Sequence, residues 1–216
     1  MTYGLKVFSG GGYTQLDSSD NGRVVYQISA SGNATVTGAG TNYGSVLVNT
    51  TITSDTLILI RPTSPSGQKA FVFRGGSGFT IYSDQNVSFQ WRAFRPATSA
   101  VGSSATYGLE VYNTSGSIVF AGSQVALRVK GTVTGTGTVS GSNLWGLGNY
   151  NIQRVTALAS PNQGRTYYWV HTFNTTSVTH ETDDAFPGAS APTAEEIFDY
   201  RWVSSITPAT LIIADI

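Results

Sequence analysis

The chain of 216 residues is 40% hydrophobic and 12% aromatic, but only 11% of its residues are charged, and 12 basic side chains balance 12 acidic ones. Zero net charge argues against nucleic acid as a partner, because a nucleic-acid binder needs a surplus of Lys and Arg to displace counterions from phosphate. The absence of cysteine excludes disulfides, thiolate metal sites and a cysteine nucleophile.

The first residues, Met1 to Val7, enter a strand pattern at once. They lack the charged region and the apolar run of about 7–15 residues that make up a secretory signal. No later stretch approaches the ~20 apolar residues of a transmembrane helix. We therefore expect a protein that is synthesised in the cytoplasm without a signal peptide and is not inserted in a membrane.

Apolar and polar residues alternate with a period of two along the chain, which is typical of half-buried strands. Two fuller apolar runs, Thr56–Ile60 and Leu211–Ile213, predict strands that are covered on both faces. One segment, Pro192–Glu196, could form a single helical turn before the last alternating run. The alternating segments are 3–7, 24–30, 87–93, 125–129 and 198–202. The pattern predicts an all-β fold.

Short motifs recur in the same order in the two halves of the chain. The opening Tyr3–Phe8 returns as Tyr107–Tyr112, 104 residues later, and Phe89–Arg92 returns as Phe198–Arg201. A third match places 64–69 against 160–165, each before an apolar run. Internal duplication explains the three matches most economically.

The duplication predicts two tandem β-sandwich units, immunoglobulin-like or jelly-roll-like. The first unit is expected at 1–95 and the second, with a C-terminal extension, at 107–216. The small, polar stretch 96–106 has the composition of a linker. The extension at Thr210–Ile213 must be buried, either by pairing within its own unit or by joining the sheet edge of a neighbouring chain.

The histidines and carboxylates do not form a recognisable catalytic or metal motif. The only histidines, His171 and His180, precede Glu181 and Asp183 at a spacing that fits no compact ligand set. We expect a solvated acidic loop there, with no metal and no cofactor. The glycine clusters do not lie between a strand and a helix, so nothing supports a phosphate-binding loop. The sequence predicts no catalytic residue and no enzyme.

Aromatic residues in a Gly/Asn-rich loop are the candidate binding residues. Trp145, Asn149 and Tyr150 lie in this loop, and Tyr43 lies near the corresponding place in the first half. Exposed rings beside amides can stack on sugars. In the other interpretation, Trp145 fills the end of the sandwich or the interface between the units.

The matching strands near the end of each half carry framework residues. Trp91 and Tyr200 occupy matching positions and are expected in the core. Arg92 and Arg201 also match, and each is expected to reach a carbonyl or carboxylate of its own unit.

The opening Tyr3–Phe8, its Gly-rich turn and Leu16–Ser19 resemble a family of small virion proteins of tailed bacteriophages. Arg92–Pro96 and the second opening, Tyr107–Asn113, are also similar to it. The second copy departs from the pattern, since Ala121-Gly122-Ser123 replaces Asp-Ser-Ser. These proteins are tail or tail-tip structural components with no catalytic residues.

The resemblance implies a virion structural component in or on the distal tail, in several copies, made in the host cytoplasm. Its partners would be other phage tail proteins. The alternative is a carbohydrate-binding or receptor-binding module that recognises a cell-surface glycan. A hydrolase ranks behind both.

Overall fold

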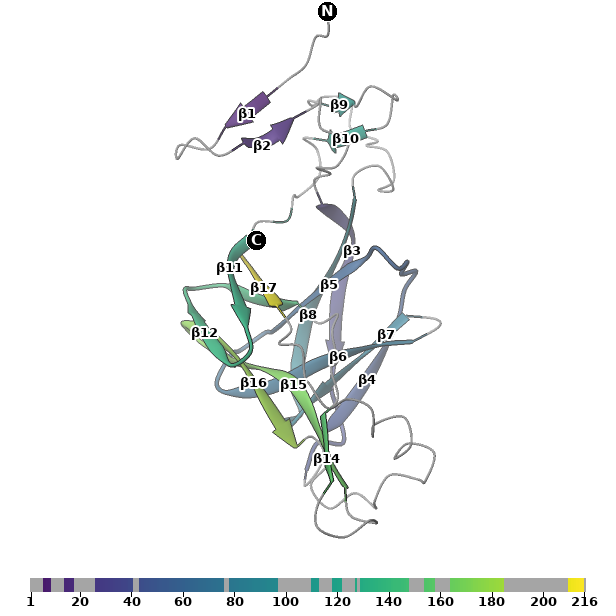
Figure 1. Ribbon diagram of the computed structural model, residues 1–216. Coiled ribbons are helices and arrows are strands. Elements are labelled where there is room, and N and C mark those ends of the chain that lie inside the picture. The colour runs from purple at the N-terminus through teal and green to yellow at the C-terminus, as the bar shows by residue number, and fades with distance from the viewer. Residues whose placement is uncertain are drawn as a thin grey trace, which may run out of the picture.

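The computed structural model describes residues 6–8, 14–17, 26–40, 43–75, 78–96, 110–112, 118–121, 127, 129–147, 154–157, 164–184 and 210–215. This part of the chain is all-β, as predicted, with seventeen strands and no helix (Figure 1). The strands of the first half are β1 (Lys6–Phe8), β2 (Thr14–Asp17), β3 (Tyr26–Thr35), β4 (Gly44–Asn49), β5 (Leu57–Pro62), β6 (Gln68–Gly75), β7 (Gly78–Ser83) and β8 (Ser88–Pro96). Those of the second half are β9 (Glu110–Tyr112), β10 (Ile118–Ala121), β11 (Val129–Thr134), β12 (Gly137–Ser140), β13 (Leu144–Leu147), β14 (Arg154–Ala157), β15 (Gly164–Asn174), β16 (Ser177–Asp184) and β17 (Thr210–Asp215).

Thirteen of these strands form two antiparallel sheets that pack on each other. The six-stranded sheet has the order β11-β17-β13-β5-β8-β3. The seven-stranded sheet has the order β12-β16-β15-β6-β7-β4, with β14 paired to β15. The remaining strands form two separate hairpins, β1-β2 and β9-β10, which lie beyond one end of the sheets in Figure 1.

The core lies between the two sheets and is rich in aromatic contacts. Trp91 of β8 meets Phe79 of β7 edge-on, with ring centroids 5.4 Å apart. Phe89 and Phe173 make a similar contact at 6.4 Å. Because each pair joins opposite sheets, these edge-to-face contacts stabilise the packing of the layers. Trp91 therefore lies in the core, as predicted.

Strands from both halves of the chain share both sheets. In the six-stranded sheet, β13 pairs with β5 at Gly146–Ile60 and Leu147–Leu59. In the seven-stranded sheet, β15 pairs with β6 through 171–173 and 68–70. We call these two strand pairs the seam. The seam gives the two halves a common, two-layered core.

The two apolar runs are central strands of the six-stranded sheet. Successive residues of a strand point to opposite faces of the sheet. Ile58, Leu59 and Ile60 are nevertheless all fully buried, so β5 is covered on both faces, as predicted. The C-terminal run forms β17, which pairs with β11 and β13 of its own chain. This pairing confirms the first of the two alternatives considered for that segment.

Several sequence predictions lie outside the described residues. They are the helical turn at 192–196, the strand at 198–202 with Tyr200 and Arg201, and the stretch 97–106. The strand expected at 24–30 is described from Tyr26 onward, as part of β3. Strand β8 ends at Pro96, the first residue of the expected linker. The division into two sandwich units and their boundaries stay predictions.

Candidate functional site

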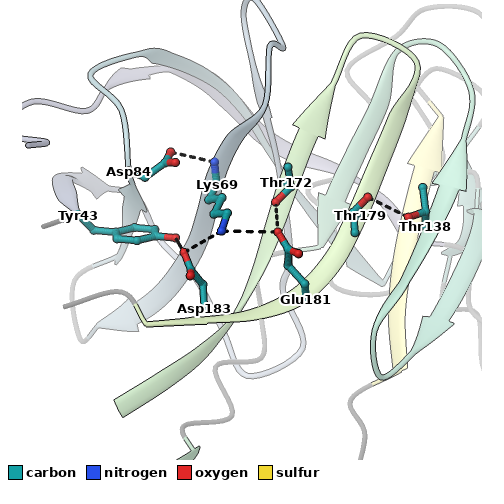
Figure 2. A network of polar contacts seen from close by, with 8 residues as sticks. All are labelled: Tyr43, Lys69, Asp84, Thr138, Thr172, Thr179, Glu181 and Asp183. Atoms are coloured by element: carbon teal, nitrogen blue, oxygen red, sulfur yellow. Dashed lines mark hydrogen bonds and ion pairs between the residues drawn. The ribbon is translucent and has the colours of Figure 1, made fainter. Parts of the chain in front are cut away.

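The outer face of the seven-stranded sheet carries a network of polar side chains (Figure 2). Successive residues of a strand point to opposite faces, so Glu181 and Asp183 of β16 share one face. Lys69 of β6 and Thr172 of β15 lie on the same face, and the strand pairing brings Thr172 opposite Lys69. Tyr43 reaches this face from the residue before β4 (Figure 2). The network thus depends on strands from both halves.

The contacts of the network centre on two carboxylates. The Tyr43 hydroxyl donates a hydrogen bond to Asp183 Oδ2 at 2.7 Å. Lys69 Nζ lies 3.3 Å from Asp183 Oδ2 and 3.8 Å from Glu181 Oε1. The Thr172 hydroxyl donates to Glu181 Oε1 at 2.5 Å. Each carboxylate therefore has one hydroxyl donor and shares the single ammonium group.

A third carboxylate, Asp84, lies beside the network in the turn after β7. It accepts a hydrogen bond from the main-chain N–H of Lys69 at 2.8 Å. Burial raises the pKa of Asp84, although the hydrogen bond and the charge of Lys69 oppose this shift. Burial, followed by the hydrogen bond to Asp183, raises the pKa of Tyr43 far above its ordinary value, so its phenol stays a neutral donor. Among the described residues of this face, three carboxylates therefore surround one lysine.

Aromatic side chains continue the same face toward β4. Tyr43 packs on Phe71, with centroids 5.6 Å apart, and Phe71 stacks on Tyr82 at 4.9 Å. Farther along, Leu47 and Phe73 are 55% and 50% exposed, and both lie opposite Thr80 in the strand pairing. An exposed apolar patch thus adjoins the polar network on one sheet surface.

The predicted binding residue Trp145 lies in the interior. It is only 3% exposed and belongs to the main hydrophobic core. Its ring is covered by the guanidinium of Arg92, whose Cζ lies 4.7 Å from the ring centroid. This position leaves no exposed indole face for stacking on a sugar, and the contact with Arg92 joins Trp145 to a residue of the first half. Burial lowers the pKa of Arg92.

The other predicted binding residues are not brought together with Trp145. Tyr43 is half-buried in the polar network of the seven-stranded sheet, whereas Trp145 is on β13 of the six-stranded sheet. Asn149 and Tyr150 lie outside the described residues. Arg92 was expected to reach a carbonyl or carboxylate of its own unit. Its described contact is instead with the ring of Trp145, in the other half of the chain.

The expectation of a solvated acidic loop after His180 is wrong, because residues 177–184 form strand β16. His171 and His180 are buried on the inner face of the seven-stranded sheet, while Glu181 and Asp183 point to its outer face. The histidines and carboxylates therefore do not converge on one point. Within the described residues, no group of three His, Asp or Glu side chains is placed to hold a metal ion.

Lys69 and Thr172 were missed by the sequence reasoning. The alternation of Lys69, Phe71 and Phe73 places them on one face, and this signal is visible in the sequence. The contacts of Lys69 with residues of β15 and β16 depend on the pairing of β6 with β15, which are about 100 residues apart in sequence. No local pattern specifies that pairing.

The part of the chain that the structure describes contains no helix that could cross a membrane. Comparison of the sequence and structure with protein-family models, curated proteins and solved structures finds no match.

Proposed function

We propose that the chain is a structural component of a tailed-phage virion, in or attached to the distal tail, and that it acts through contacts with other tail proteins. The proposal begins from the resemblance carried by Tyr3–Phe8 and Tyr107–Tyr112. A particle protein of this kind is made in the host cytoplasm, is present in several copies and needs no catalytic residue. The low charge and strand-rich architecture are suited to such contacts.

The observation that carries the proposal is that the segments with the resemblance form the same hairpin twice. In both hairpins three residue pairs match in register, and the same irregularity falls between the last two pairs. Neither hairpin belongs to one of the large sheets. The pairs are Lys6–Asp17, Val7–Leu16 and Phe8–Thr14 in the first, and Glu110–Ala121, Val111–Phe120 and Tyr112–Ile118 in the second.

A repeated hairpin outside the main core supports a role in protein contacts. Two-stranded hairpins of this length are marginally stable alone in water, so they gain stability from whatever they pack against. Tyr112, on the second hairpin, is an exposed aromatic residue, and aromatic residues are enriched in protein interfaces.

We also propose that the fold consists of two tandem sandwich units that arose by duplication. The order of pairing supports this proposal, because each half supplies three neighbouring strands to each sheet. In the first half they are β5-β8-β3 and β6-β7-β4, and in the second they are β13-β17-β11 and β15-β16-β12. The halves then meet at equivalent strands, β5 with β13 and β6 with β15. Strand β14 is extra in the second half, and β17 takes the place of β8, whereas the sequence match had paired Phe89–Arg92 with Phe198–Arg201.

The virion proposal is tested on purified phage particles produced from the genome that encodes this chain. An antibody to the chain, visualised by immunogold electron microscopy, should label the distal tail. Mass spectrometry of the same particles should detect the chain in several copies. Its absence from purified virions would contradict the proposal.

A second function, binding of a cell-surface glycan, is favoured by the outer face of the seven-stranded sheet. There the exposed ring of Phe73 lies on the same face as Lys69 of the network, because both residues belong to β6 and are four positions apart. Sugar-binding faces combine an aromatic platform with polar groups that fix orientation. A glycan array with the intact chain, the Phe73→Ala variant and a Tyr112→Ala control tests it. Binding that Phe73→Ala abolishes and Tyr112→Ala preserves supports this function, and no binding removes it.

A further inference from the structure

The two histidines of the chain are neighbours in the core. His171 of β15 pairs directly with His180 of β16, and their ring centroids are 5.3 Å apart. Their side chains face the interior, and the residues are 3% and 1% exposed. The sequence contains no other histidine. Every imidazole of the protein is therefore in this pair.

His171 contacts both strand pairs of the seam. It is the residue of β15 that pairs with Ala70 of β6. Its Nε2 lies 2.8 Å from the carbonyl oxygen of Leu147, and Leu147 is the residue of β13 that pairs with Leu59 of β5. A Cβ on Gly146 would lie 2.9 Å from His171 Cγ, so the ring rests directly on the β13 backbone. One imidazole thus links the two sheets where the two halves meet.

The hydrogen bond of His171 defines which nitrogen carries its proton. A carbonyl oxygen only accepts, so Nε2 is the protonated nitrogen of the neutral ring. A second proton would have to reside on Nδ1, which is buried and has no hydrogen-bond partner among the described residues. Protonation would therefore place a charge in the core without an acceptor for the new N–H.

The charged groups on the surrounding strands compensate for such a charge only in part, through Glu181 acting on His180. Lys69 of β6 and the carboxylates of β16, Glu181 and Asp183, belong to the outer face. Arg74 of β6 binds the carbonyls of Thr53 and Thr56. Strands β12 and β13 contain no titratable side chain. On the inner face, the two histidines are titratable neighbours of each other.

Burial is the main cause of low pKa values for both rings. It lowers the pKa of His171 to about 3, and the charge of His180 lowers it further. Burial lowers the pKa of His180 to about 4, while a main-chain hydrogen bond and Glu181 oppose this shift. Both rings are therefore neutral in the folded protein at pH 7, and protonating one disfavours protonating the other.

We propose that His171 and His180 form an acid-sensitive joint between the two halves of the chain, so that their protonation opens the seam. The proposal is independent of the virion role. In the unfolded chain a histidine titrates near pH 6.5. Stability is complete above that pH and falls as the pH drops toward the folded values, because the open state binds more protons. With two histidines, the ratio of closed to open protein falls by up to about 100-fold for each unit by which the pH is lowered in this window.

Two measurements on the intact protein test the proposal. The first follows the imidazole signals by NMR between pH 8 and pH 4, where only two residues contribute. We expect neutral rings that persist well below pH 6.5 and lose intensity as the folded population falls. Two imidazoles that titrate near pH 6.5 in a protein that remains folded would overturn the proposal.

The second measurement reports on the seam. The chain has no cysteine, so cysteines at the exposed positions Ser64 and Thr176 can carry two spin labels. These positions flank the contact of Gly67 N–H with Phe173 O, 2.7 Å long, beside the β6-β15 pairing. A narrow distance distribution at pH 7.5 should broaden at pH 5 and recover at pH 7.5. An unchanged distribution at pH 5 would contradict the proposal.

A double variant, His171→Gln with His180→Gln, provides the matched control because neither amide titrates in this range. In this variant the distance distribution should be the same at pH 7.5 and pH 5. A broadening equal to that of the parent would assign the acid response to other groups and overturn the proposal. If the variant does not fold, the two measurements on the parent chain still decide the question.

Discussion

The guanidinium of Arg92 lies on the ring of Trp145, 4.7 Å from its centroid, across the intervening strand β5. The contact joins a residue of the first half to a residue of the second. It explains why an indole in a Gly-rich segment is buried, since the ring packs on a strand of the other half. Together with the strand pairs of the seam, it makes the two halves depend on each other.

The Arg92–Trp145 contact predicts an energetic coupling between the halves. A double-mutant cycle with Arg92→Met and Trp145→Leu should give a coupling free energy of about 0.5–2 kcal/mol, the range of cation–π contacts. Urea unfolding of the parent, both single variants and the double variant measures it. Additive single effects would show that the ring and the guanidinium do not interact.

Removal of the buried indole should be costly, whereas its replacement by a smaller ring should be tolerated better. Trp145→Ala should lower the free energy of unfolding by about 3–5 kcal/mol, because it leaves a cavity in the core. The indole N–H has no hydrogen-bond partner among the described residues, so Trp145→Phe also removes an unsatisfied donor. We expect Trp145→Phe to cost less than half as much in urea unfolding. Equal costs would contradict this packing.

Gly146 should not accept a side chain. A Cβ there would lie 2.9 Å from His171 Cγ and 3.1 Å from Phe173 Cζ, both in packed rings. Gly146→Ala should therefore destabilise the fold by about 1–3 kcal/mol. Gly40→Ala is the control, because nothing lies within 4 Å of its Cβ position, and it should change stability by less than about 0.5 kcal/mol. Thermal unfolding compares the two, and similar values for both would contradict the account.

Loss of the Tyr43 hydroxyl should weaken the polar network. Tyr43→Phe removes the donor to Asp183 and leaves that carboxylate with Lys69, so we expect a loss of about 1–2 kcal/mol in the free energy of unfolding. In the background of Asp183→Asn the same change should cost measurably less. Urea unfolding at pH 7 tests both, and an equal cost in the two backgrounds would show that the hydroxyl does not act through Asp183.

The raised pKa of Asp84 predicts a stability effect with a defined sign. A carboxyl whose pKa is higher in the folded state favours folding at low pH and loses this contribution as the pH rises through its folded pKa. Asp84→Asn keeps an acceptor for the Lys69 N–H but has no charge to bury. The variant should be at least as stable as the parent at pH 7, and this relative gain should disappear below about pH 4. A marked loss of stability at pH 7 would contradict the direction of the shift.

Local alternation was sufficient to predict the all-β class, the strands at 24–30 and 87–93, and the buried Trp91. The fuller apolar run Thr56–Ile60 predicted a strand covered on both faces, which the fully buried Ile58, Leu59 and Ile60 of β5 confirm. These features follow from the period of a strand and from apolar content, which are properties of neighbouring residues.

The features that could not be predicted all depend on long-range pairing. Lys69 meets Thr172, and Arg92 meets Trp145, only because β6 pairs with β15 and β13 with β5. The acidic loop was a wrong expectation for a related reason. The segment after His180 is rich in charge, but in strand β16 the charged residues alternate with buried ones. Composition alone does not reveal such an alternation when one of its buried members is a histidine.

The joining of the two halves in shared sheets is the claim on which the acid-sensitive joint depends. A protease site placed between residues 97 and 109 of the full chain, cleaved after folding, tests it most directly by size-exclusion chromatography with mass determination. We predict that the two fragments stay together as a 1:1 complex of parental mass and separate only in denaturant. Two folded fragments that separate in native buffer at neutral pH would contradict the account.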